Sequence, residues 1–118
     1  MFGFTRAAER GAKCDLYVLS NKDKSKSKVG ITCKGTPSRR AIDYSREHPE
    51  HGPWEPVWSK RTRCAAKAER LAHTSLAKER VTTKTGAKEI FAVKPAKAVK
   101  VAKRHERREC GCWLLPSF

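Results

Sequence analysis

The sequence lacks the features that would place a protein in a membrane or outside the cell. No stretch approaches the roughly 18 consecutive apolar residues of a membrane-spanning helix, and the opening MFGFTRAAERGAK has charges too closely spaced for a signal peptide. It also lacks a CxxC pair, and its cysteine count of five is odd. We therefore expect a soluble, cytoplasmic protein with reduced thiols, in which Cys14, Cys33 and Cys64 are small core residues.

Acidic residues are scarce compared with basic ones. The chain has 27 Lys and Arg against 12 Asp and Glu, a formal net charge of +15, and the excess is spread over both halves. Such a charge favours a polyanionic partner, with nucleic acid first, because binding phosphates releases counterions. A localisation signal or binding to a membrane surface is a weaker alternative.

The length of 118 residues predicts one domain with a modest core that needs neither metal nor disulfides. No internal repeat is visible. We expect an N-terminal extension over 1–13, the domain over 14–108 and a tail over 109–118, whose sequence fits no pattern.

Two β-branched runs at 15–20 and 28–33, separated by a polar turn, predict a β-hairpin. If the loop holds an even number of residues, Tyr17, Lys28 and Gly30 share one face of it. A glycine within a strand marks a bulge or a close approach by a backbone or ligand. Gly30 is therefore expected to keep the sheet bare beside Lys28 for a phosphate.

A helix is predicted to begin at Pro37 with Thr36 as its N-cap, and a strand to follow from residue 53. Pro56 places this strand toward a sheet edge. Trp54 and Trp58 are expected on one face, where packing in the core is favoured over base stacking.

The remaining segments are a helix over 64–80, a turn around Gly86, a short strand ending at Val93 and a basic helix from residue 94. The order β-β-α-β-α-β-α predicts a small α+β domain around an antiparallel or mixed sheet. Cations along one face of the last helix are Lys97, Lys100, Arg104 and Arg107.

Cleavage of a phosphodiester needs a base for water, cations for the developing charge and often a metal held by a carboxylate. Tyr17, Lys28, Gly30, Arg40 and Glu69 together offer these parts. Magnesium suits a site with one carboxylate because it keeps most of its waters.

At this point the sequence resembles a known family. DLY at 15–17, KVG at 28–30, an arginine on the next helix and a glutamate on a later one are similar to the GIY-YIG nuclease superfamily. The resemblance covers about 14–103 and is closest to a phage and bacterial branch with lysine before Ile-Gly. TPSRRAIDY, GPWEPVWS, AERLAHTSL and KEIF resemble further segments of that branch.

The resemblance implies a role for each matching residue. Tyr17 would activate or orient the attacking water, Arg40 would stabilise the phosphate, and Glu69 would bind Mg²⁺ or Mn²⁺. His73 matches a histidine of the branch whose role stays open, and Arg39 competes with Arg40 because helical phase does not choose between them.

Two departures from the family's pattern concern the first and second motifs. Asp15-Leu16 stands for Gly-Ile, and Lys28 stands where many of these nucleases have a second tyrosine. Lysine cannot replace a phenol one for one. It is available either as a base, if its environment lowers its pKa, or as a phosphate clamp.

We therefore expect a metal-dependent endonuclease that hydrolyses nucleic acid, with DNA as the expected substrate, in a bacterial or phage-infected cell. One alternative is a catalytically weakened GIY-YIG-like module that only binds nucleic acid, and another is a basic interaction protein for an acidic partner. Expected nucleic-acid contacts are Gly30, Lys34, Arg39, Lys97, Lys100, Arg104 and Arg107.

Overall fold

The computed structural model describes residues 11–81 and 89–114, with side chains as far as residue 110. The strands are β1 (Cys14–Asn21), β2 (Ser27–Thr32), β3 (Trp54–Thr62) and β4 (Ile90–Phe91). The helices are α2 (Pro37–Glu47), α3 (Ala65–Ser75), the short η1 (Ala77–Glu79) and α4 (Pro95–Leu114). This confirms the predicted α+β class. In the described part of the chain, no helix is long and apolar enough to cross a membrane.

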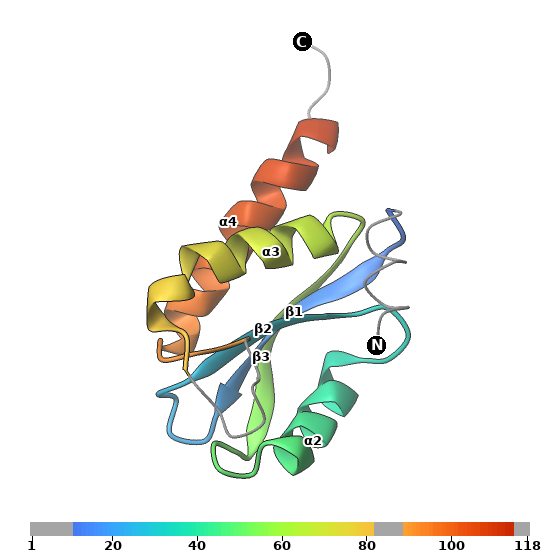
Figure 1. Cartoon of the computed structure of the whole chain (residues 1–118). Helices are drawn as coiled ribbons and strands as arrows, with labels where there is room; N and C mark the ends of the chain where they lie inside the picture. The colour runs from blue at the N-terminus through green and yellow to red at the C-terminus, as the bar shows by residue number, and fades with distance from the viewer. Residues whose placement is uncertain (1–10, 82–88, 115–118) are drawn as a thin grey trace.

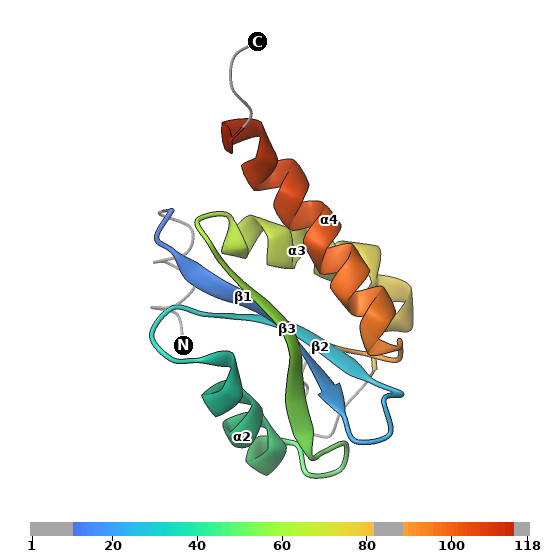
Figure 2. The same cartoon turned by 180° about the vertical axis from the view of Figure 1, so that it is seen from behind.

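The four strands form one antiparallel sheet in the order β3-β1-β2-β4. Helix α2 lies on one face of this sheet, and α3 and α4 lie together on the other (Figures 1 and 2). β3 is an edge strand, as Pro56 predicted. The sheet therefore has two differently covered faces, called here the α2 face and the α4 face.

The predicted hairpin is confirmed, with Tyr17 opposite Gly30 and Leu19 opposite Lys28. Its turn is held by side chains, because Asn21 Oδ1 accepts from the Lys26 amide at 2.9 Å. Alternation along each strand then brings Tyr17, Lys28 and Gly30 onto the α2 face.

Helix α2 begins as the sequence predicts. Thr36 Oγ1 accepts a hydrogen bond from the Arg39 amide at 3.1 Å, and Pro37 is the first helical residue. The cap fixes the first turn, which carries Arg39 and Arg40, just beyond the end of β2.

A separate apolar cluster fills each side of the sheet. Small side chains of α3, among them Ala68 and Ala72, are fully buried and let this helix lie closely on the sheet. The smaller cluster on the α2 face is rich in aromatic residues and comprises Tyr17, Leu19, Ala41, Tyr44, Trp54 and Ile90.

The expectation that the two tryptophans share a face was wrong. The register of β3 shifts so that Trp58 lies opposite Val18 while Pro56 lies opposite Leu19, which leaves Val57 as an extra residue. This bulge reverses the alternation. Trp54 packs in the α2-face cluster, and Trp58 packs against the other one.

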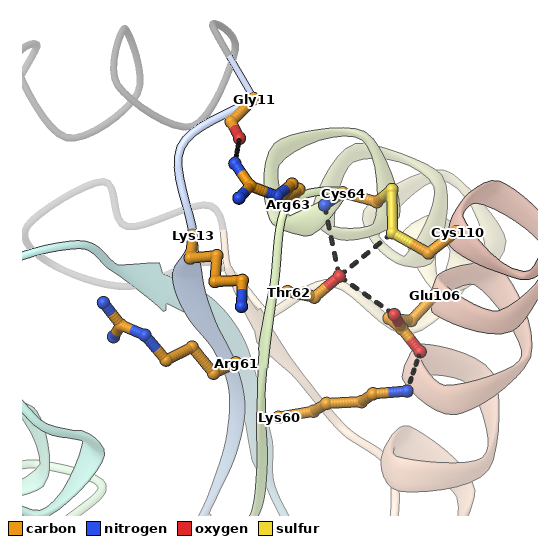
Figure 3. A pocket seen from close by; sticks show the side chains of 9 residues that line it. All are labelled: Gly11, Lys13, Lys60, Arg61, Thr62, Arg63, Cys64, Glu106 and Cys110. Atoms are coloured by element: carbon orange, nitrogen blue, oxygen red, sulfur yellow. Dashed lines mark hydrogen bonds and ion pairs between the residues drawn. A yellow bond between two sulfur atoms is a disulfide. The ribbon is translucent and has the colours of Figure 1, made fainter. Parts of the chain in front are cut away.

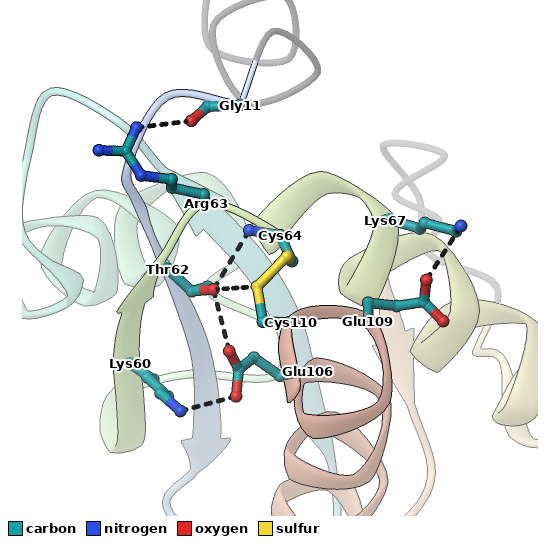
Figure 4. Close-up of a disulfide and its surroundings, with 9 residues drawn as sticks. All are labelled: Gly11, Lys60, Thr62, Arg63, Cys64, Lys67, Glu106, Glu109 and Cys110. Atoms are coloured by element: carbon teal, nitrogen blue, oxygen red, sulfur yellow. Dashed lines mark hydrogen bonds and ion pairs between the residues drawn. A yellow bond between two sulfur atoms is a disulfide. The ribbon is translucent and has the colours of Figure 1, made fainter. Parts of the chain in front are cut away.

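The expectation of reduced thiols was also wrong. Cys14 is bonded to Cys33. Cys64 is bonded to Cys110, as Figure 4 shows. The first bond joins the start of β1 to the residue after β2, and the second joins the residue before α3 to α4. Sequence separations of 19 and 46 carry no local signature of such pairs.

The helices differ from the predicted ones in length. α3 ends at Ser75 and is followed by η1, whereas a single helix over 64–80 was expected. α4 continues to Leu114, so Cys110 lies on a helix rather than in an unpatterned tail. The predicted turn around Gly86 lies outside the described residues.

Candidate active site

Lys28 is the centre of a buried polar cluster on the α2 face. Its side chain is only 4% exposed, and its Nζ lies 3.8 Å from the centre of the Tyr44 ring and 5.5 Å from that of Tyr17. Glu89 Oε1 lies 3.9 Å from the same nitrogen. Two aromatic faces and a carboxylate thus compensate for the loss of water around the ammonium group.

The Tyr17 hydroxyl lies directly over Gly30. A Cβ atom on residue 30 would lie 2.7 Å from this hydroxyl oxygen and 3.0 Å from Lys28 Cε. Gly30 therefore leaves room for Tyr17 rather than for a phosphate. It is itself buried, so the surface contact with nucleic acid expected of Gly30 is not supported.

Of the two candidate arginines, Arg40 faces the site. It is half-buried and forms a hydrogen bond with the Tyr17 side chain. Burial alone would lower the pKa of Arg40, but this bond and the charges of Tyr17, Glu47 and Asp43 raise it above its usual range. Arg39 points to solvent, with 65% of its side chain exposed, and pairs with Asp43 at 3.5 Å.

Glu69, on α3, is within electrostatic range of Lys28 and Glu89. Burial raises the pKa of Glu69 to about 7, against the opposing charge of Lys28 and with a further increase from Glu89. Its carboxyl group therefore changes protonation near neutral pH.

His73 lies one turn after Glu69 and binds the sheet backbone. Its Nε2 lies 2.8 Å from the carbonyl oxygen of Val29. Burial lowers the pKa of His73, so the ring is neutral at neutral pH and Nε2–H donates to the carbonyl. This bond occupies the ring nitrogen and ties α3 to β2, which sets the position of Glu69.

Sequence reasoning did not assign two members of the cluster, Tyr44 and Glu89. Tyr44 follows Arg40 by four residues and so lies on the same side of α2, a spacing that could have revealed it. Its hydroxyl is buried without a hydrogen-bond partner among the described residues. Burial, and next the charge of Glu89, raise the pKa of Tyr44 above its usual range, so it remains a phenol. Glu89 belongs to the KEIF segment, next to β4.

The carboxylates of this cluster fit a magnesium-type ion. Magnesium binds through one or two carboxylates and keeps several waters, which matches Glu69 with Glu89 nearby. A closed zinc site needs four ligands. Within residues 11–81 and 89–110, no group of three His, Cys, Asp or Glu side chains is placed to hold a metal.

The other predicted contact residues lie apart from this cluster. Lys34 is exposed just after β2. The four cations of α4 are all exposed, and Lys97 pairs with Glu79 at 3.2 Å. Since α4 covers the face opposite α2, these cations are not part of the site around Lys28 (Figure 2).

Comparison with known proteins gives one match, to the family model described as the T5orf172 domain, over residues 16–106. No curated protein and no solved structure matches the chain. The matched range contains every member of the cluster, from Tyr17 on β1 to Glu89 beside β4.

Proposed function

The chain belongs to the T5orf172 domain family, which is nuclease-related, and we propose from this that it is a metal-dependent endonuclease that hydrolyses phosphodiester bonds of DNA. The observation that carries the proposal is the cluster around Lys28. It involves a tyrosine hydroxyl, a guanidinium, an ammonium and a carboxyl group from four elements, β1, α2, β2 and α3.

Tyr17 and Arg40 act as one unit in this proposal. A water oriented by the Tyr17 hydroxyl would attack the phosphorus and lose a proton to solvent, while the bond from phosphorus to the leaving sugar oxygen breaks and that oxygen takes up a proton from solvent. Arg40, bonded to the same hydroxyl, would neutralise the charge that develops on the phosphate oxygens. The pair is positioned before substrate binds. Gly30 leaves the space that the Tyr17 side chain occupies, and the Thr36 cap fixes the first turn of α2, which carries Arg40.

Lys28 serves as a fixed cation in this scheme rather than as the base. Its contacts with two tyrosine rings and with Glu89 suit an ammonium group. It would add positive charge beneath the phosphate and hold Tyr17 in place. This accounts for a lysine at the position of the family's second tyrosine.

Glu69 would hold Mg²⁺ or Mn²⁺, with waters and substrate oxygens as the other ligands. When bound, the metal would supply a positive charge beside the leaving oxygen. Glu69 has to be ionised for this role, and its pKa of about 7 makes that dependent on pH.

The test is incubation of the purified protein with plasmid and single-stranded DNA in Mg²⁺ or Mn²⁺. Glu69→Ala and Tyr17→Phe should each reduce cleavage by roughly 100-fold or more, as loss of one charge-stabilising group does. Glu55→Ala, which removes an exposed carboxylate from β3, is the matched control and should cleave normally. Cleavage that survives both site substitutions would contradict the assignment.

A second candidate function, binding of nucleic acid without cleavage, is favoured by one observation, the lysine at the place of a second phenol. It predicts no cleavage with either metal but binding that weakens steeply with salt. Indifference to nucleic acid at every salt concentration would instead favour an acidic protein partner.

A further inference from the structure

A second basic surface lies at the end of the sheet away from the hairpin turn. Lys13, Arg61 and Arg63, called here the strand-end cations, line a hollow of about 700 Å³ between the start of β1, the end of β3 and α4 (Figure 3). None of the three belongs to the cluster around Lys28.

The register places one of these cations, Arg61, on the face that carries Tyr17. Ser59 lies opposite Tyr17, and Arg61 lies opposite Asp15, two residues earlier on β1. Lys60, by contrast, lies opposite Leu16 and extends to the other side of β3, toward α4 (Figure 3). Lys13 and Arg63 directly adjoin Cys14 and Thr62, the last residues paired between the two strands.

Among the described residues, little acidic charge opposes the strand-end cations. Lys13 and Arg63 are exposed, and within the described part of the chain Arg63 donates to the Gly11 carbonyl oxygen at 3.3 Å. Arg61 pairs loosely with Asp15, at 3.8 Å. Glu106 also lines the hollow but is 3% exposed, with one oxygen bonded to Lys60 at 2.8 Å and the other to Thr62 at 2.9 Å.

A rigid frame supports this end of the sheet. The Thr62 hydroxyl accepts from the Cys64 amide at 3.2 Å and lies 3.1 Å from Cys110 Sγ (Figure 4). The Cys64–Cys110 bond joins the same point to α4, and the Cys14–Cys33 bond brings exposed Lys34 to the same end of the sheet. The frame holds the backbone that carries these charges, so binding needs no ordering of this backbone and costs only the rotamer freedom of the side chains.

We propose that Lys13, Arg61 and Arg63 form a second contact surface for the sugar-phosphate backbone of DNA whose phosphodiester bond is bound by Arg40, the partly exposed partner of buried Tyr17. The inference rests on the proposed function and extends it to a binding surface. Tyr17 and Lys13 are separated by about 13 Å along β1, at about 3.3 Å per residue. That span covers several phosphates, since each strand of a duplex carries one every ~3.4 Å along its axis.

The experiment measures binding of a short synthetic DNA duplex in EDTA, which prevents cleavage, over a series of salt concentrations. In the variant Lys13→Gln/Arg61→Gln/Arg63→Gln, the slope of log K against log salt should fall by about 2 to 3, since each phosphate contact contributes about 0.9. The control Lys22→Gln/Lys78→Gln/Lys94→Gln removes the same charge from exposed positions elsewhere and should change the slope by less than about 1.

Equal slopes for the two triple variants would overturn the proposal. Displacement of the duplex by polyglutamate at equal charge concentration would also overturn it, because that polyanion has no sugar-phosphate backbone. Thermal melting checks the fold, and Arg61→Gln alone should lower the slope by about 1 if the triple variant melts early. If wild type does not cleave plasmid but the triple variant has a reduced salt slope, the proposed nuclease activity is contradicted and this surface is not. If wild type cleaves plasmid but the triple variant keeps the wild-type slope, this surface is contradicted and the nuclease activity is not.

Discussion

Lys28 shows how one residue can connect a site built from distant segments. Its ammonium group lies against the rings of Tyr17 and Tyr44 and beside Glu89, and its charge lowers the pKa of Glu69. These partners come from β1, α2, the start of β4 and α3. A substitution of any of these residues should therefore change the positions or the pKa values of the others.

The first prediction at this scale concerns pH. Metal binding needs ionised Glu69, so cleavage should rise as pH increases through about 7. Glu89→Gln removes a negative charge that raises the pKa of Glu69, so the midpoint should move to lower pH. Rate profiles for wild type and variant at a Mg²⁺ concentration well below saturation measure the shift, with Glu55→Gln as the control. A midpoint that stays fixed in Glu89→Gln would contradict the electrostatic coupling.

The second prediction concerns the glycine beneath Tyr17. Gly30→Ala places a Cβ 2.7 Å from the Tyr17 hydroxyl oxygen, so the tyrosine has to move. Such crowding costs about 1 to 3 kcal/mol of unfolding free energy, and displacement of the hydroxyl from Arg40 should reduce cleavage at least about tenfold.

Thermal unfolding and initial rates of plasmid cleavage measure these two effects. Gly35→Ala is the matched control, because its nearest neighbour, Thr32 Oγ1, would lie 3.4 Å away in ordinary contact. If Gly30→Ala cleaves and unfolds like this control, the close approach has no functional importance.

At the scale of elements, the N-cap of α2 links local structure to the site. Thr36→Ala removes the bond to the Arg39 amide and should lower the unfolding free energy by about 1 kcal/mol. Loosening of the first turn should also weaken the hold of Arg40 on Tyr17 and so reduce the cleavage rate. Chemical denaturation and single-turnover rates are the measurements. Ser38→Ala, in the same turn, keeps the cap and should leave both quantities near wild type.

Elements determined by local signals could be predicted from the sequence. The hairpin register followed from alternation and loop parity, and the start of α2 followed from Thr36 and Pro37. The bulge at Val57 could not be predicted, because it depends on how β3 pairs with β1 rather than on the residues of β3 alone. Trp58 was predicted on the wrong face because simple alternation does not allow for the extra residue Val57.

The site was predictable to a similar extent. Tyr17, Lys28, Arg40 and Glu69 were named from motif order, and the structure gathers Tyr17 with Arg40 and Glu69 with Lys28. The sequence could not choose between Arg39 and Arg40, because the choice depends on which side of α2 faces the sheet. In the structure Arg39 is on the side that faces solvent. Glu89 was missed because a lone carboxylate near a short strand resembles any solvated charge until the fold brings it to Lys28.

At the scale of the whole molecule, the Cys64–Cys110 bond joins α4 to the junction between β3 and α3, 46 residues earlier. Cys64→Ala/Cys110→Ala should lower the unfolding free energy by about 2 to 4 kcal/mol. Cleavage at low temperature should persist, since the Lys28 cluster does not include this bond.

Melting curves with and without a reducing agent measure this effect. Wild type should melt earlier when reduced, and a variant with Cys14, Cys33, Cys64 and Cys110 all replaced by Ala should not respond. An identical response in wild type and in this variant would show that the bonds do not contribute to stability.

The bulge in β3 also affects self-association of the protein at high concentration. Among the described strands, β3 pairs with β1 alone, so within this part of the chain its outer edge has backbone groups that another strand could bind. Pro56 has no amide hydrogen to offer, Val57 breaks the regular spacing of donors, and Lys60 and Arg61 repel an identical chain. The irregularity that turns Trp54 away from Trp58 thus also discourages self-association through this edge and protects the protein from aggregating.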